Sequence, residues 1–316
     1  MAQQARAKKV IGIGMACLDQ LIVWQDLRTP LAANRLLGHD VQGGGMAATA
    51  LVTVARLGGK AEFWGAVGND WIGDLILRGL RDEGVGTSQV RRVAGQRGPM
   101  MMVWIDQPTG ERHFFRLTGF CRTPRPVGSL ARLKSAGCLL VDQTRPESIL
   151  RAAREARRLG VPVVGDLGSV GDEVRKVLRY VDYAIFSETA VGDLAAGGNY
   201  RRACQAIRAM GPPHVVITLG RRGLVFLEGG RFGRLSAFPV KVVDTTGAGD
   251  TVHGAFCYGL VEGLPLEKNL AFASAVAAMK CRRLGGRAGI PTRAEVVRFL
   301  KQRKIDVFAA GRRRSS

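Results

Sequence analysis

A short segment at positions 244–250, with the sequence D-T-T-G-A-G-D, places two aspartates around five small residues. Apolar residues at 240–243 precede it and helical spacing follows it, so the pattern predicts a strand, a glycine-rich turn and a helix start. In that geometry the backbone N–H groups of Gly247, Ala248 and Gly249 have no partner inside the helix. They point at an anion, and the helix dipole adds to the attraction. The segment therefore predicts an anion hole for a phosphoryl group in transit.

Asp250 falls in the first turn of the predicted helix, beside this anion hole. An ionised carboxylate there accepts the proton of an attacking hydroxyl group, and phosphoryl transfer needs little beyond positioning, charge stabilisation and such a base. We therefore predict that Asp250 is the catalytic base. The alternative is that Asp250 only stabilises the helix N-terminus electrostatically. That alternative would be preferred for a lone aspartate, but here two aspartates bracket the glycine-rich turn. We expect His253, three residues later, to shape the pocket or to bond the backbone.

The rest of the chain alternates strand-like apolar runs with stretches of helical spacing. We predict strands at 10–14, 61–67, 138–141, 161–166, 183–186 and 215–218. We predict helices at 43–57, 71–83, 146–159, 172–180 and 200–210. Such alternation favours an α/β fold in which helices sandwich a doubly wound, mostly parallel sheet. Sheets of this kind bind ligands at the carboxyl ends of their strands.

The chain carries 47 Lys and Arg against 26 Asp and Glu, which gives a net charge of +21. A site for phosphate-bearing ligands uses part of such a field, and so does a nucleic-acid binder. The arginines are scattered, however, the aromatic content is only 6%, and the compact basic run is confined to 312–314. A diffuse arginine bias is the simpler explanation, and we expect no specific nucleic-acid partner.

No run of about 18 apolar residues is present, so we expect no transmembrane helix and no membrane partner. The segment 1–9 is polar and basic, and the apolar run at 10–16 is short and glycine-rich, which favours a buried strand over a signal peptide. Six cysteines occur without C-x-x-C spacing, which disfavours a zinc site and a disulfide framework. We expect buried free thiols in a reducing, cytoplasmic environment.

The D-T-T-G-A-G-D segment closely resembles the signature of the ribokinase or PfkB carbohydrate kinase family. Further segments agree with the family in order, over residues 9–301. They are G-I-G at 12–14 with Asp19, G-G-G at 43–45, L-G-G at 57–59, G-A-V-G-N-D at 65–70, V-I-T-L-G at 216–220 and G-G-R-A-G-I-P at 285–291. The resemblance implies a ribokinase-like domain at 1–301 that transfers a phosphoryl group from ATP to a primary hydroxyl of a sugar or sugar derivative.

The resemblance also assigns the remaining parts of the chain. Residues 20–42 and 95–120, the second with a hairpin pattern, correspond to the family's small β lid, which keeps water from competing with the sugar. Residues 302–316 then form a basic C-terminal tail. The implied cofactors are ATP and Mg²⁺, with a monovalent cation as a further candidate. We expect a homodimer, because an exposed lid sheet favours pairing between copies.

The family's motifs assign candidate site residues by position. We expect the sugar at Asp19, whose carboxylate oxygens accept hydrogen bonds from vicinal hydroxyls, and at the turn of Gly43, Gly44 and Gly45. A loop aspartate that caps a local turn is the alternative for Asp19. The cofactor-binding residues implied by the resemblance are Ser187, Thr218, Gly220, Gly223, Thr246, Gly286 and Gly289.

The chain departs from the family pattern at two places. Ala48 stands where the family usually has Asn, and the stretch that begins with Ser187 and Glu188 replaces the family's Asn-x-x-Glu. That motif handles magnesium and phosphate, so we expect Glu188 to take over part of this role through water.

Within the family, the scaffold is most similar to the sulfofructose kinase branch, although the three positions expected to hold a sulfonate are not kept. Arg116 and Arg145 are candidates for binding an acidic group of the substrate, since arginine forks fit oxyanions. Two solvated arginines are the alternative. The sequence leaves the sugar open. The rival functions are a nucleoside kinase on the same fold and a nucleic-acid-binding or regulatory protein that retains it.

Overall fold

In the computed structural model of the chain, residues 8–308 are described except 110–111, 120, 122–126 and 145. Arg145 and the tail from 309 onward therefore lie outside the described residues. No helix in the described part of the chain has both the length and the apolar character needed to cross a membrane.

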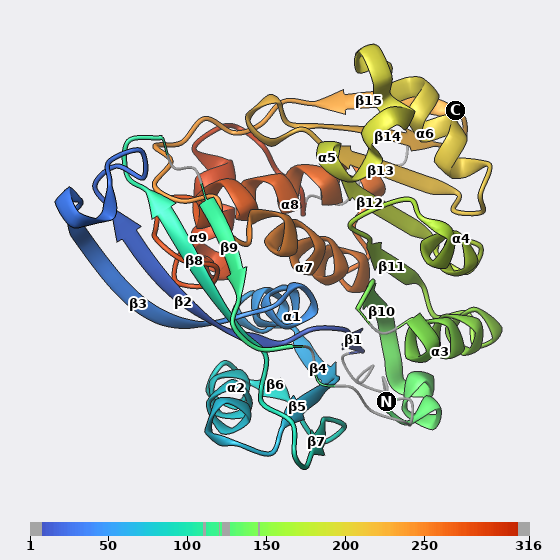
Figure 1. Cartoon of the computed structure of the whole chain (residues 1–316). Coiled ribbons are helices and arrows are strands. Elements are labelled where there is room, and N and C mark those ends of the chain that lie inside the picture. Colours follow the sequence, from blue (N-terminus) through green and yellow to red (C-terminus); the bar gives the residue numbers. More distant parts are fainter. Residues whose placement is uncertain (1–7, 110–111, 120, 122–126, 145, 309–316) are drawn as a thin grey trace.

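The main sheet runs through the centre of the molecule (Figure 1). Its neighbouring strands are, in order, β15 (Arg231–Leu235), β14 (Leu224–Glu228), β13 (His214–Thr218), β12 (Tyr183–Ser187), β11 (Val163–Asp166), β10 (Ala136–Asp142), β1 (Lys9–Ile13), β4 (Lys60–Trp64) and β6 (Val85–Gly86). All neighbouring pairs from β13 to β6 are parallel, and β14 and β15 are antiparallel additions at one edge. The predicted doubly wound, mostly parallel sheet is confirmed.

Helices cover both faces of this sheet and bury two separate apolar clusters. One cluster includes α1 (Met46–Arg56), α2 (Trp71–Asp82), α7 (Ala248–Val261), α8 (Leu266–Lys280) and α9 (Arg293–Lys301). The other includes α3 (Pro146–Arg158), α4 (Asp172–Leu178), the short α5 (Glu188–Val191) and α6 (Tyr200–Arg208). In β1, Val10 joins the first cluster and Ile11 and Ile13 join the second, because successive side chains of a strand point to opposite faces.

A second sheet projects from one side of the main body (Figure 1). Its strand order is β3 (Leu36–Gly44), β2 (Cys17–Trp24), β8 (Met100–Asp106) and β9 (Arg112–Arg116). Its strands fall within or directly beside the segments predicted to form the lid, 20–42 and 95–120. Aromatic rings pack on it, with the centroid of Trp104 5.7 Å from that of Trp24 and 4.9 Å from that of Phe115. A short third sheet pairs β5 (Ala66–Gly68) with β7 (Arg91–Val93).

The predicted strand at 240–243 is wrong. The backbone there is irregular, and Val242 and Val243 are 56% and 51% exposed. The N–H groups of Val243 and Asp244 both donate to the carbonyl oxygen of Cys281, at 2.8 and 3.2 Å. The segment is thus held against the end of α8 and not in a sheet.

Two other predicted elements have different bounds. The helix predicted at 43–57 begins only at Met46, because Gly43 and Gly44 belong to β3 and pair with β2. The strand predicted at 61–67 is two strands, since β4 ends at Trp64 in the main sheet and β5 pairs with β7.

Candidate active site

The turn that begins α7 contains the predicted anion hole. Gly247 caps the helix with φ +70°, and a Cβ there would lie 2.9 Å from the Gly286 carbonyl oxygen. Both the backbone conformation and the close contact therefore require glycine at this position. The Ala248 N–H donates to Thr245 O at 3.1 Å. Among the described residues, the N–H groups of Gly247 and Gly249 have no backbone acceptor. Two of the three predicted amides thus stay available to an anion.

Asp244, the first aspartate of the motif, organises this turn. Its Oδ1 accepts hydrogen bonds from the N–H and the hydroxyl of Thr246, both at 2.8 Å. Its Oδ2 accepts the N–H of Gly285 at 2.7 Å. The buried carboxylate therefore ties the anion-binding turn to the glycine loop at 285–289 and brings Thr246 and Gly286 to the same place.

Asp250 lies in the first turn of α7, within electrostatic range of buried Asp19 and Asp142 and of partly buried Asp166. Burial, together with the carboxylates of Asp166, Asp19 and Asp142, raises the pKa of Asp250 well above the usual aspartate range. Burial also raises the pKa of each of the other three carboxyls. A carboxyl with a raised pKa is a stronger base once ionised, which suits proton abstraction from a hydroxyl group.

Asp19 lies on β2 against the end of β3. A Cβ at Gly44 would lie 2.0 Å from Asp19 Oδ2, so only glycine leaves space for this carboxylate. The Cys17 thiol donates to Asp19 Oδ1 at 3.1 Å. The guanidinium of buried Arg287 donates to Gly44 O at 2.8 Å and lies over Gly43. Asp19 thus belongs to a polar site between the second sheet and the 285–289 loop.

His253 bonds the backbone, as predicted. Its Nδ1 lies 2.8 Å from Gly249 O and its Nε2 lies 3.2 Å from Ile185 O. The Asp166 carboxylate is 3.5 Å from Nδ1. The ring therefore links the first turn of α7, which carries Asp250, to strands β11 and β12.

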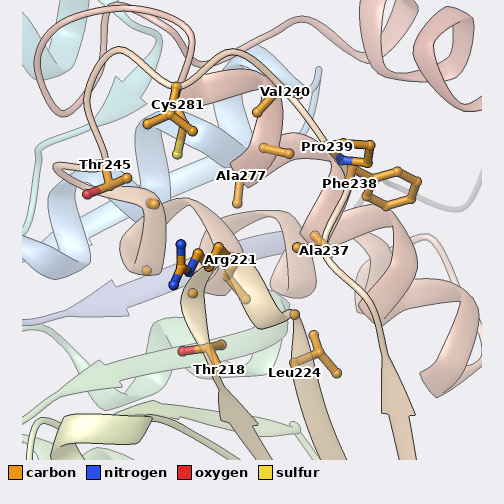
Figure 2. Close-up of a pocket in the computed structure, with 18 residues that line it drawn as sticks. Thr218, Arg221, Leu224, Ala237, Phe238, Pro239, Val240, Thr245, Ala277 and Cys281 are labelled. Carbon is orange, nitrogen blue, oxygen red and sulfur yellow. The ribbon is translucent and has the colours of Figure 1, made fainter. Parts of the chain in front are cut away.

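A cavity of about 370 Å³ opens beside the anion-binding turn. Gly249 lines it, together with the predicted cofactor residues Thr218, Gly220 and Gly223. Figure 2 shows Ala277 and Cys281 on one wall, Thr218 and Leu224 opposite them, and the side chain of Arg221 between. The mostly small, apolar walls suit a flat aromatic ring. Ser187, Thr246, Gly286 and Gly289 are not among the residues that line this cavity.

Glu188 and Ser187 lie where β12 meets α5. The Glu188 carboxylate accepts hydrogen bonds from the guanidinium of Arg222 and the hydroxyl of Tyr200, and the bond from Arg222 is the main reason that its pKa is lowered. Ser187 caps α5 by accepting the N–H of Ala190. No group of three metal-binding side chains occurs among the described residues.

The two arginines predicted to bind an acidic group of the substrate stay a prediction. Arg145 lies outside the described residues, and Arg116 is exposed on β9. A further arginine on the same strand, Arg112, donates from Nη1 to the hydroxyl of Thr246 at 3.3 Å. The guanidinium group of a residue on the second sheet thereby contacts the anion-binding turn.

Comparison with known proteins decides the family. The family described as pfkB family carbohydrate kinase matches residues 21–293. The chain belongs to this family. As a PfkB-family carbohydrate kinase it is an ATP-dependent enzyme that phosphorylates a sugar.

Relatives of this PfkB-family kinase include ribokinases. A ribokinase from Bacillus subtilis is 27% identical over 299 residues, which cover 93% of this chain and 99% of that protein. One from Arabidopsis thaliana is 30% identical over 317 residues, which cover 95% and 83%. The structure of Arabidopsis thaliana ribokinase complexed with ribose and ATP matches with a TM-score of 0.83 and 25% identity, and covers 93% of this chain and 99% of that one. The sulfofructose kinase branch stays a prediction.

Sequence reasoning missed three charged residues of this PfkB-family kinase. Asp142 and Asp166 each end a parallel strand, β10 and β11. Carboxylates at the carboxyl ends of predicted strands were a usable signal, since ligands bind at that edge. Arg112 had no such signal. It and the predicted Arg116 lie on the same strand, β9, and only the pairing of that strand with β8 in the structure shows where each of them lies.

Proposed function

We propose that this kinase transfers the γ-phosphoryl group of ATP to a primary hydroxyl group of a sugar or sugar derivative, with Asp250 as general base. The observation that carries the proposal is the position of Asp250. It is in the first turn of α7, next to Gly249 of the nucleotide cavity, and the carboxylate of Asp19 acts on it electrostatically. Phosphate from one side and acceptor from the other would meet at its carboxylate.

In the proposed reaction, Asp19 accepts hydrogen bonds from the sugar hydroxyls and orients the acceptor. Asp250 takes the proton as the hydroxyl oxygen attacks phosphorus. The N–H groups of Gly247 and Gly249 and the guanidinium of Arg112 face the negative charge on the transferring group. Bound Mg²⁺ would neutralise phosphate charge, with Glu188 as the candidate to hold it through water.

The second sheet is the proposed lid and also the proposed contact between two copies of the chain. Exposed apolar side chains gather on its outer strands, at Leu36, Leu37, Val41, Phe114 and Phe115. Exposed apolar surface of this kind favours association. Light scattering at micromolar concentration tests the proposed homodimer, and a monomer there would contradict it.

The function is tested by ADP release with a panel of ribose, fructose, sulfofructose, sugar phosphates and nucleosides, with Asp250→Asn as the matched control. We expect phosphorylation of a sugar or sugar derivative and its loss in the variant. Turnover confined to nucleosides would favour the nucleoside kinase instead. Turnover of sugars that survives Asp250→Asn would reject Asp250 as the base.

A further inference from the structure

Lys280, the last residue of α8, is a fully buried lysine that the proposed reaction does not use. Its Nζ donates a hydrogen bond to the backbone carbonyl oxygen of Asp244 at 3.1 Å. A buried ammonium group is costly unless other groups compensate its charge. Burial lowers the pKa of Lys280 and the nearby Arg112 repels its charge, while the carboxylates of Asp244 and Asp250 attract it. The C-terminal end of α8 adds a favourable dipole.

The partner of Lys280 is the residue that organises the anion-binding turn. The Asp244 carboxylate holds Thr246 and Gly285, as described above, while its carbonyl oxygen faces the Lys280 ammonium. The next residue, Cys281, fixes the same segment by accepting the N–H groups of Val243 and Asp244. The end of α8 therefore holds Asp244 from the backbone side, and the ammonium places a positive charge beneath the turn.

The position of Lys280 also bears on the monovalent cation considered from the sequence. Carbonyl oxygens are the ligands that potassium binds in proteins, and an ammonium group has a similar size and the same charge. At Asp244 that carbonyl oxygen already accepts a hydrogen bond from Nζ. The residues present at this turn thus do not fit an added monovalent cation.

We propose that Lys280 is a positioning residue for phosphoryl transfer: its ammonium group holds the anion-binding turn in place and supplies the positive charge that a bound monovalent cation would otherwise supply there. The proposal rests on the proposed function of this turn. The enzyme then needs no added monovalent cation.

The first test compares the wild-type enzyme with Lys280→Met, which keeps the side-chain volume and removes the charge. Wild-type activity should agree within about twofold in potassium, sodium and choline chloride at equal ionic strength. Lys280→Met should lower kcat by about tenfold or more and leave the KM of the acceptor within about threefold, because charge beneath the turn acts on the transition state. Lys301→Ala, an exposed lysine on α9, controls for the loss of one positive charge.

The second test asks whether an ion replaces the missing ammonium group. Lys280→Ala leaves space beside the Asp244 carbonyl, so potassium or ammonium chloride should raise its kcat by about fivefold or more while choline chloride does not. The same salts should raise its melting temperature by about 2 °C or more over choline chloride, with no such difference in wild type.

Two outcomes would overturn the proposal. One is a wild-type enzyme whose activity requires potassium. The other is a folded Lys280→Met enzyme with unchanged kcat. The melting comparison separates this proposal from the kinase assignment, since it needs no turnover: an ion-specific shift in Lys280→Ala supports the positioning role even for a protein that phosphorylates no sugar. A melting temperature of that variant that is the same in all three salts is a third outcome that would overturn the proposal.

Discussion

At the scale of single residues, Asp250 combines a catalytic position with an environment that disfavours its charge. Asp250→Asn should keep the fold and ATP binding, and it should lower kcat by about 10² to 10⁴, because proton transfer by a positioned base contributes that much. Coupled-assay kinetics at saturating substrates measure the change. A folded variant within about threefold of wild type would reject the assignment.

The same substitution should stabilise the protein. A carboxyl whose pKa is raised in the folded state contributes stability below its unfolded pKa, and that contribution is lost as the pH rises through the folded pKa. At neutral pH, where an exposed aspartate is ionised, the environment of Asp250 therefore costs stability whether this carboxyl keeps its charge or binds a proton, and the asparagine avoids that cost. Differential scanning calorimetry at pH 7 should show a higher melting temperature for Asp250→Asn than for wild type.

The raised pKa also sets the pH dependence of the reaction. Because the base must be ionised, kcat/KM should fall on the acid side at a pH well above the value of about 4 for an ordinary aspartate. Burial and the carboxylates of Asp166, Asp19 and Asp142 are the cause. The measurement is kcat/KM for the acceptor between pH 4 and pH 9. An acid limb at the ordinary value would mean that these groups do not perturb the base.

The two arginines of β9 offer a matched pair. Arg112 contacts Thr246 of the anion-binding turn, whereas Arg116 lies exposed four residues further along the strand. Arg112→Ala should lower kcat by about 10-fold or more, because an arginine facing the transferring phosphoryl group stabilises its charge. Arg116→Ala should change kcat far less. Equal effects of the two substitutions would assign Arg112 a structural role only.

At the scale of elements, the turn before α7 shows why a glycine is placed at 249. Apart from its chain neighbours and the nearby backbone of its own helix, a Cβ there would meet no protein atom within 4 Å, so the space beside it is open to a ligand. Gly249→Val should therefore fold and yet bind and turn over ATP poorly, since its side chain occupies the approach to the backbone amides. Circular dichroism and nucleotide titration measure the two effects. A folded variant with normal turnover would show that the amides do not hold phosphate.

Elements that are buried on both faces were predictable, while those set by distant contacts were not. The runs at 138–141 and 183–186 are apolar throughout because parallel strands between two helical layers have no solvent face. The run at 240–243 is also mostly apolar, with three valines around Lys241, but its hydrogen-bond acceptor is Cys281, some forty positions away in the chain. Likewise the glycine-aspartate spacing revealed Asp250, and nothing local distinguished Arg112 or Lys280.

At the scale of the whole molecule, the net charge of +21 bears on whether the protein binds nucleic acid. Basic residues scattered over a globular protein contact few phosphates at once. On duplex DNA, each neutralised phosphate adds about 0.9 to the steepness with which the logarithm of the binding constant falls with the logarithm of the salt concentration. We expect weak, salt-sensitive DNA and RNA binding without sequence preference. Fluorescence anisotropy at about 150 mM salt measures it. Tight, sequence-selective binding would contradict this expectation and would give the kinase a second, nucleic-acid-binding function.

The aromatic packing on the second sheet gives this protein an optical signal of its own. The chain has four tryptophans, and Trp24 and Trp104 lie together on β2 and β8, edge to face. Trp64, by contrast, is fully buried in the main body. Indole emission depends on the surrounding polarity, so a shift of this sheet against the body would change the spectrum of the paired tryptophans and leave that of Trp64 unchanged. Closure over a substrate would therefore be visible in the unlabelled enzyme, as a change in its intrinsic fluorescence.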